Sequence, residues 1–402
     1  MQAASLVLPL VTVPFLARTL GPAMWGQVAA AQGFAMLAGL IVEFGFNISA
    51  ARMVAQQREE PVRLAGTYAA VTTAQALLLV LAVLVALTAR SHVPFLVQNG
   101  GLFWAAIIWM IPQVISFQWY YQGVEQMPRL AALVLAGRIA GLAGVFAVVK
   151  SPDDAMYSLL IPGLAGLIAT GWAGLLPCFH LRPSWPGPAG IRSVLGGGLA
   201  LCGFRAGMAL QGAANTFLLA CFLSPQLVGA YAGADRLIRA AGALLEPVLV
   251  TVFPRVAYLQ ASGEAGDRGQ AESWRRWSRL CLLAAGGAIA VMFWVLAPWL
   301  PAWVLGPGYE EATPILRVLA LSPLAGVLLQ GAGMNGLAAR GEDGALNRVV
   351  ITGGLLQVST LLGLGWMVRD LPPVCFAAAT VSGQFLVWLW LERAAAGRGG
   401  AA

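Results

Sequence analysis

Long apolar stretches separated by short polar connections run through the whole chain. A helix that crosses a lipid bilayer needs about 20 mostly apolar residues, and twelve windows meet this requirement. The pattern predicts an all-α integral membrane protein with about twelve transmembrane helices. The predicted crossings are residues 1–17, 27–49, 65–88, 102–122, 130–149, 155–177, 194–222, 229–253, 280–304, 312–334, 347–367 and 373–391.

Basic residues in the connections predict the orientation. With a cytoplasmic N-terminus, fifteen arginines fall on cytoplasmic connections and the C-terminal tail, whereas three arginines and Lys150 fall on the other side. Short cytoplasmic loops of membrane proteins carry an excess of basic residues. Both termini are therefore predicted to face the cytoplasm, and the two longest connections, 178–193 and 256–279, lie on that side.

Composition supports the same class of protein. Apolar residues make up 59% of the chain and charged residues 10%, whereas a soluble domain usually carries about 25% charged residues. The polar surface is too small to cover a soluble core of this length. The formal net charge is +7 and is spread over short loops, which favours an anionic lipid surface as the partner and argues against nucleic acid.

Motifs for cofactors and catalysis are missing from the sequence. Lys150 is the only lysine and follows Val149, so a glycine-rich phosphate loop ending in Gly-Lys cannot form. The five cysteines are scattered without a C-x-x-C pair, and His92 and His180 lie singly in predicted connections. We therefore predict no disulfide, no metal site, no cofactor and no catalytic residue.

The two halves of the chain match each other at an offset of 203 residues. The matches combine a turn, small residues, an acidic position and a basic position in one register without a gap. Such self-similarity indicates an internal structural repeat. The matched positions are Leu20-Gly21-Pro22 and Gly26 with Leu223-Ser224-Pro225 and Gly229, Ala29 and Ala31 with Ala232 and Ala234, Glu43 with Glu246, and Arg52 with Arg255.

An even number of helices in each half gives the halves one orientation, related by an axis along the membrane normal. We expect two parallel six-helix bundles around a central cavity. The predicted parts are an N-terminal bundle (1–177), a cytoplasmic linker (178–193), a C-terminal bundle (194–391) and a cytoplasmic tail (392–402). The offset places the start of the seventh helix about ten residues before Met1, so the first helix is expected to be truncated.

Several charged residues lie inside the predicted crossings. Each would cost roughly 2.5–3.5 kcal/mol at the bilayer centre if unpaired, so they must pair, face a wet cavity or lie near an interface. Asp235 and Arg239 are four residues apart and can pair on one helix face, which leaves Arg236 over. They include Glu43, Arg138, Arg205, Asp235, Arg236, Arg239, Glu246 and Arg317.

The chemistry of these residues suggests an anionic substrate. Arginine grips phosphate oxygens with a bidentate fork, so a cavity lined by Arg138, Arg205 and Arg236 would suit a large anion. A buried carboxylate can carry a proton or bind a cation, although a pair with a nearby arginine is the alternative reading. The ion-coupling candidates are Glu43, Asp235 and Glu246.

Four segments, in order, resemble the polysaccharide-repeat-unit flippases of the multidrug/oligosaccharidyl-lipid/polysaccharide exporter superfamily. They cover both halves of the chain, and the helix count and chain length agree with the family. The segments are LPLVTVPFLARTLGPAMWGQVAAAQ (Leu8–Gln32), EFGFNISAARMVA (Glu43–Ala55), WYYQGVEQMPRLA (Trp119–Ala131) and VGAYAGADRLIRAAGALLEPVLVTVFPRVA (Val228–Ala257).

The resemblance implies a MATE-like fold and a secondary transporter, not an enzyme. Such proteins turn undecaprenyl-diphosphate-linked oligosaccharide, an O-antigen or exopolysaccharide repeat unit, across the bacterial inner membrane by alternating access. Implied partners are the lipid-linked substrate, membrane lipids, and the polysaccharide polymerase and chain-length machinery. The family's cationic cavity implies as substrate-binding candidates Arg18, Arg52, Arg138, Arg205, Arg236, Arg239 and Arg255. For Arg18, Arg52 and Arg255, which lie at helix ends, snorkelling to the interface is the alternative.

Two other functions compete with this interpretation. A multidrug exporter of the same fold would favour an acidic or aromatic cavity. The surplus of arginine argues against such a cavity. A membrane polysaccharide polymerase or glycosyltransferase usually needs a sizeable outside loop with catalytic residues, and the predicted outside loops are short. Asp153 and Asp154 are an acidic pair in one such loop, but a solvated turn is the better interpretation.

Overall fold

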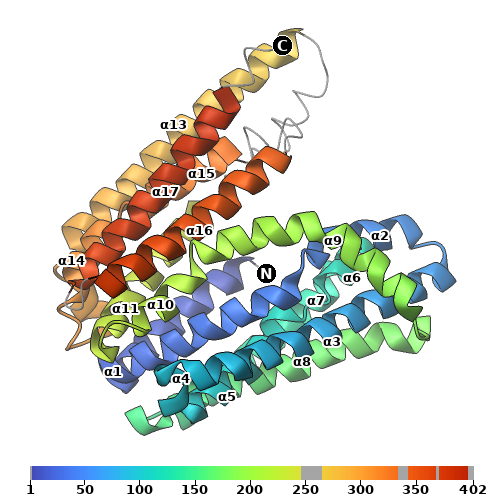
Figure 1. Cartoon of the computed structure of the whole chain (residues 1–402), viewed down its shortest axis with the longest axis horizontal. Helices are drawn as coiled ribbons and strands as arrows, with labels where there is room; N and C mark the ends of the chain where they lie inside the picture. Colours follow the sequence, from blue (N-terminus) through green and yellow to red (C-terminus); the bar gives the residue numbers. More distant parts are fainter. Residues whose placement is uncertain (1, 246–264, 334–342, 368–370, 397–402) are drawn as a thin grey trace. The chain divides into compact units, whose positions relative to one another are not determined.

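The structure is a computed structural model that describes residues 2–245, 265–333, 343–367 and 371–396. Every regular element within these ranges is a helix (Figure 1). The predicted all-α class is therefore confirmed for the described part of the chain. The labels below follow Figure 1.

The chain packs into two compact units, which are described separately. Unit 1 comprises Met1–Leu8 and Gln27–Ala209, and unit 2 comprises Pro9–Gly26 and Leu210–Ala402. Helix α1 (Gln2–Glu43) contributes to both. The other helices of unit 1 are α2 (Phe46–Gln57), α3 (Pro61–His92), α4 (Pro94–Gln98), α5 (Gly100–Val114), α6 (Gln118–Gly123), α7 (Met127–Val148), η1 (Pro152–Met156), α8 (Tyr157–Leu181) and α9 (Gly187–Leu210).

Unit 2 holds the remaining helices, and its described pairs include α13 with α15, α15 with α17, α16 with α17, and α11 with α14. The two units are defined by which residues pack together, whereas the two predicted bundles are defined by position in the sequence. The bundle boundaries therefore stay a prediction. The helices are α10 (Ala213–Ala220), α11 (Pro225–Gly242), η2 (Ala243–Leu245), α13 (Ala265–Leu296), η3 (Pro301–Leu305), α14 (Ala312–Leu319), α15 (Ser322–Ala332), α16 (Asp343–Met367) and α17 (Pro373–Ala396).

Nine stretches of the described chain are long and apolar enough to cross a membrane. They overlap ten of the twelve predicted windows. Of the other two, 194–222 falls on α9 and α10, and 229–253 falls on α11 and η2 up to residue 245, with 246–253 outside the described residues. The count of twelve stays a prediction, as does the orientation. The nine are Leu10–Gln57, Pro61–His92, Gly100–Gly123, Met127–Val148, Pro152–Leu181, Arg276–Leu296, Ala312–Leu329, Gly344–Met367 and Pro373–Ala394.

Helix α1 accounts for two predicted windows. At 1.5 Å per residue a straight helix of this length would measure about 63 Å, roughly twice the hydrocarbon thickness. The helix is broken at Gly21, whose φ of 71° and ψ of 168° are not helical. Only glycine adopts such a conformation without strain from a Cβ atom. Gly21 therefore separates the two apolar windows, 1–17 and 27–49.

Glycines set the close packing of α8 against its two neighbours in unit 1. On α7, Cβ atoms built at Gly137 and Gly141 would lie 2.7 Å from the Ala169 side chain and 3.0 Å from the Pro162 backbone. On the other side of α8, a Cβ at Gly163 would lie 2.9 Å from the Trp109 backbone of α5. Small residues let membrane helices approach closely, which explains their presence here.

The Trp-Tyr-Tyr-Gln-Gly segment of α6 serves packing in unit 1. Trp119 and Tyr121 are buried, and the Tyr121 hydroxyl donates to the Ala173 carbonyl at 2.9 Å. Tyr68 of α3 packs at a tilt against Trp119 and edge-on against Tyr120, and it donates its hydroxyl to the Gly174 carbonyl at 2.5 Å. The segment therefore ties α3, α6 and α8 together.

The acidic pair between α7 and α8 forms a turn, as predicted. The Asp154 carboxylate accepts hydrogen bonds from the Lys150 and Ser151 backbone N–H groups, both at 3.0 Å, and from the Ser151 hydroxyl at 2.9 Å. This is a capping box at the start of η1. The carboxylate is thus used to end one helix and start the next, and the interpretation of the pair as a solvated turn is confirmed.

Two glycines at matching positions of the repeat touch each other within unit 2. A Cβ built at Gly26 would overlap the Pro225 carbonyl oxygen and lie 2.7 Å from the Gly229 nitrogen. A Cβ at Gly229 would overlap the Pro22 carbonyl oxygen and lie 3.2 Å from the Gly26 nitrogen. The contact is reciprocal, as it is across a two-fold axis, and it supports the repeat found in the sequence.

Candidate functional site

Helix α11 positions three of the charged candidates that the structure describes, Asp235, Arg236 and Arg239. Pro225 stands in its first turn, where the missing N–H costs nothing, and the following small residues are buried. Tyr231, Asp235 and Arg239 are spaced by four residues and so lie along one face of the helix. Arg236 lies beside that face, one residue after Asp235.

Asp235 and Arg239 form the ion pair that their spacing predicts. The Arg239 Nε donates to the Asp235 Oδ2 at 2.6 Å, and the side chains are 51% and 18% exposed, respectively. The guanidinium lies against Gly212, where a Cβ would stand 3.1 Å from its Nη1. The pair therefore neutralises the half-buried carboxylate and leaves part of the guanidinium accessible.

Arg236 has a different environment. Its guanidinium carbon lies 4.3 Å from the centroid of the Trp25 ring, and Trp25 is fully buried. A cation over an aromatic face is held electrostatically by the ring. Arg236, which has no part in the predicted Asp235–Arg239 pair, is thus held by an aromatic ring.

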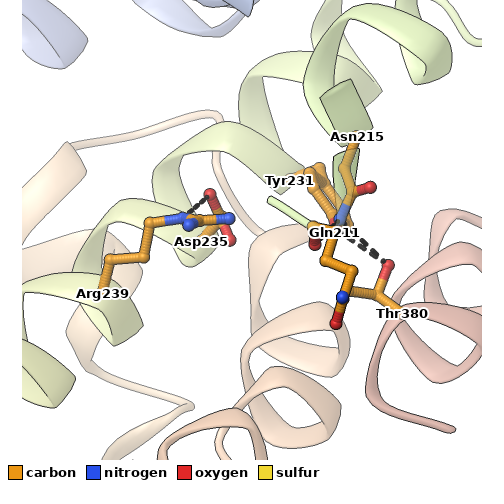
Figure 2. A network of polar contacts seen from close by, with 6 residues as sticks. All are labelled: Gln211, Asn215, Tyr231, Asp235, Arg239 and Thr380. Atoms are coloured by element: carbon orange, nitrogen blue, oxygen red, sulfur yellow. Dashed lines mark hydrogen bonds and ion pairs between the residues drawn. The ribbon is translucent and has the colours of Figure 1, made fainter. Parts of the chain in front are cut away.

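Neutral polar side chains form a buried network next to this face of α11 (Figure 2). The Thr380 hydroxyl of α17 lies 3.3 Å from the Tyr231 hydroxyl and 3.5 Å from the Asn215 amide nitrogen of α10. Gln357 of α16 donates to the same hydroxyl at 3.3 Å. Within the described chain, the buried Asn215 Oδ1 has no hydrogen-bond partner, so it can accept one more hydrogen bond.

Sequence reasoning missed this network because it searched the apolar windows for charges alone. Asn215, Gln357 and Thr380 are each at most 3% exposed, although all three side chains are polar. Polar side chains inside a membrane are satisfied by bonds between helices. A search of the windows for Asn, Gln and Thr would have found these three positions, but not that they meet.

The other candidates lie elsewhere. Arg18 of unit 2 donates to the Trp303 carbonyl. Arg52 on α2 and Arg138 on α7 are exposed, and Glu43 at the end of α1 is half-buried, all in unit 1. Arg255, Glu246 and the side chain of Arg205 lie outside the described residues. The structure therefore groups Arg236, Arg239 and Asp235, and the roles of the remaining candidates stay predictions.

This arrangement has the chemistry of a binding site. Two neighbouring guanidiniums can donate charge-assisted hydrogen bonds to phosphate oxygens. Asp235 limits the net positive charge, and the buried Tyr231, Asn215 and Thr380 network holds α11 against α10 and α17. The two guanidiniums suit the recognition of an anion.

Comparison with known proteins gives two kinds of match. The family model described as polysaccharide biosynthesis protein matches residues 1–260. Two curated relatives are each named "Putative O-antigen transporter". The protein from Escherichia coli K12 is 23% identical over 384 residues, covering 94% of this chain and 91% of the relative. The protein from Shigella dysenteriae is 24% identical over 391 residues, covering 88% of both.

Solved structures share the fold. An inward-facing multidrug resistance MATE family transporter of the MOP superfamily aligns with a TM-score of 0.70 at 11% identity, covering 99% of both chains. The lipid II flippase MurJ in an inward closed conformation aligns with a TM-score of 0.67 at 12% identity, covering 97% of this chain and 85% of the other. The MATE-like fold predicted from the sequence is thereby supported.

Proposed function

Because the chain belongs to the polysaccharide biosynthesis protein family, we propose that it is a flippase for undecaprenyl-diphosphate-linked oligosaccharide. It is a multi-pass membrane transporter, not an enzyme. The relatives named as O-antigen transporters and the likeness to a lipid II flippase support this class. The carried molecule is an O-antigen or exopolysaccharide repeat unit, and the membrane is the bacterial inner membrane.

The observation that carries the proposal is the pair of guanidiniums on α11. Arg236 is held over Trp25 and Arg239 is held by Asp235. The diphosphate carries the negative charge of the substrate, and phosphate oxygens match the fork of arginine. These two arginines hold the diphosphate while the oligosaccharide crosses between the leaflets.

The transport step proceeds by alternating access, with the site open first to the cytoplasm and then to the periplasm. Asp235 is the carboxylate beside these two arginines that could couple the step to an ion. Protonation or cation binding at Asp235 would weaken its pair with Arg239 and change the charge offered to the diphosphate. A polymerase and the chain-length machinery would use the product on the periplasmic side.

A multidrug exporter is the second candidate, because a MATE transporter shares the fold. Charge decides between the two functions. Helix α11 itself carries two arginines and one aspartate, whereas a cationic drug needs an excess of acidic or aromatic groups. The cationic balance favours the anionic lipid-linked substrate.

Depletion of the protein in its own cells tests the proposal. We expect lipid-linked repeat units to accumulate in the cytoplasmic leaflet and surface polysaccharide to fall, with both effects reversed by the wild-type gene. The measurement is extraction of lipid-linked oligosaccharide, with periplasmic glycosidase access reporting its leaflet. Loss of a polymerase would instead leave single repeat units on the surface. Normal surface polysaccharide with raised drug sensitivity would overturn the proposal and favour the multidrug exporter.

A further inference from the structure

Unit 1 contains an open groove of about 490 Å³ between the end of α1, the middle of α3 and the first turns of α9. We call this the α9 groove, and it is lined by Phe44, Leu77, Pro188, Ile191, Leu195 and Gly196. Arg192 is the one charged side chain that lines it within the described residues. The proposed transport step leaves this groove unused.

The position of the α9 groove follows from its surroundings. Trp185, just before α9, is 71% exposed, and tryptophan is enriched at membrane–water interfaces. Leu77 lies sixteen residues after Pro61, the start of α3, or about 24 Å along the helix. With the predicted orientation, the groove therefore runs from the cytoplasmic interface toward the middle of the bilayer.

Gly196 shows that part of the wall is bare backbone. A Cβ built at Gly196 would meet no atom within 4 Å, whereas one at Gly198 would lie 2.5 Å from the Phe44 carbonyl oxygen. Close helix packing explains Gly198 but not Gly196, although glycine inside a helix costs about 1 kcal/mol relative to alanine. A glycine with open space beside it in an apolar wall suits a ligand that approaches the backbone.

Arg192 supplies the one charge among the described residues that line the groove. It is exposed, and no ion pair to a carboxylate is found for it among the described residues. An apolar groove with a single guanidinium matches an amphiphile with one long chain and one phosphate end. A diacyl phospholipid has two chains, so it fits this shape less well.

We propose that the α9 groove holds the polyprenyl chain of the lipid-linked substrate, with Arg192 contacting the phosphate next to the chain. This inference rests on the proposed function and adds a site for the lipid half of the substrate. The polyprenyl chain stays within the membrane along α3 and α9, so the groove keeps the lipid bound while the hydrophilic half of the substrate is transported.

Binding to the purified full-length protein, followed by native mass spectrometry, tests this site. Undecaprenyl phosphate is the probe, undecaprenol is the uncharged control and phosphatidylglycerol is the competitor. We expect Gly196→Leu to fill the groove and weaken binding of both undecaprenyl lipids at least tenfold. Gly197→Leu is the matched control, because Gly197 is exposed, its Cβ would meet nothing within 4 Å, and it does not line the groove. Its binding should equal that of the wild type.

Arg192→Ala distinguishes binding of the phosphate from binding of the polyprenyl chain. We expect it to weaken undecaprenyl phosphate about tenfold and to leave undecaprenol binding unchanged. Equal binding by Gly196→Leu and Gly197→Leu would overturn the inference, as would displacement of undecaprenyl phosphate by an equal concentration of phosphatidylglycerol. Neither result would alter the accumulation of lipid-linked repeat units on depletion, so the inference can fail while the proposed function stands.

Discussion

Replacing Arg236 with alanine should lower surface polysaccharide more than tenfold at matched protein levels. The guanidinium over Trp25 is one of two described cations on α11 that we assign to the diphosphate. A hydrogen bond to a charged group contributes about 1.5–3 kcal/mol, which corresponds to roughly a tenfold to hundredfold change in the equilibrium. Complementation of depleted cells, read by quantitative staining of the surface glycan, measures the effect.

A second arginine of unit 2 provides the control. Arg317 of α14 also lies over a tryptophan, 5.5 Å from the centroid of the Trp294 ring, but it is exposed and is not one of the arginines assigned to the substrate. Arg317→Ala should retain wild-type surface polysaccharide. Arg236→Lys should give an intermediate level, because lysine keeps the charge but loses the planar fork. Wild-type transport by Arg236→Ala would remove Arg236 from the site.

Replacing Gly229 with alanine should destabilise the protein strongly. The added methyl group would overlap the Pro22 carbonyl oxygen, and a backbone atom cannot move aside as a side chain can. Overpacking costs about 1–3 kcal/mol, so we expect the melting temperature of the purified protein to fall by roughly 2–10 °C. Gly26→Ala should behave alike, because its methyl group would meet Pro225.

Gly242→Ala is the matched control for the glycine contact. Gly242 ends the same helix, and a Cβ at this position would meet nothing within 4 Å. Alanine there should leave the melting temperature unchanged or raise it slightly, since it lowers the entropy of the unfolded chain. If Gly229→Ala melts at the wild-type temperature, the reciprocal contact does not hold the two segments together.

Apolar length and helical spacing made much of the fold predictable. Most described residues of the predicted crossings are helical, because 20 apolar residues in lipid have few alternatives to a helix. The Asp235–Arg239 pair and the Asp154 turn were predictable for a related reason. Both depend on residues at most four positions apart, whose relative placement is set by local geometry.

Contacts between distant segments were not predictable from this one sequence. Trp25 and Arg236 are far apart in the chain, and no local pattern indicates that they stack. The same holds for Asn215 and Thr380, which come from α10 and α17. The repeat offset pairs Gly26 with Gly229, but only the fold shows that their backbones touch. Such contacts follow from tertiary packing, which composition and periodicity do not encode.

The most direct test of flipping uses purified protein in proteoliposomes. A fluorescent undecaprenyl-diphosphate oligosaccharide is incorporated, and a membrane-impermeant quencher reports the fraction exposed in the outer leaflet. We predict that the wild-type protein exposes the inner-leaflet pool to the quencher, and that Arg236→Ala slows this exchange more than tenfold. Folded wild-type protein that leaves the inner-leaflet pool protected, with and without proton or sodium gradients, would contradict the assignment as a flippase.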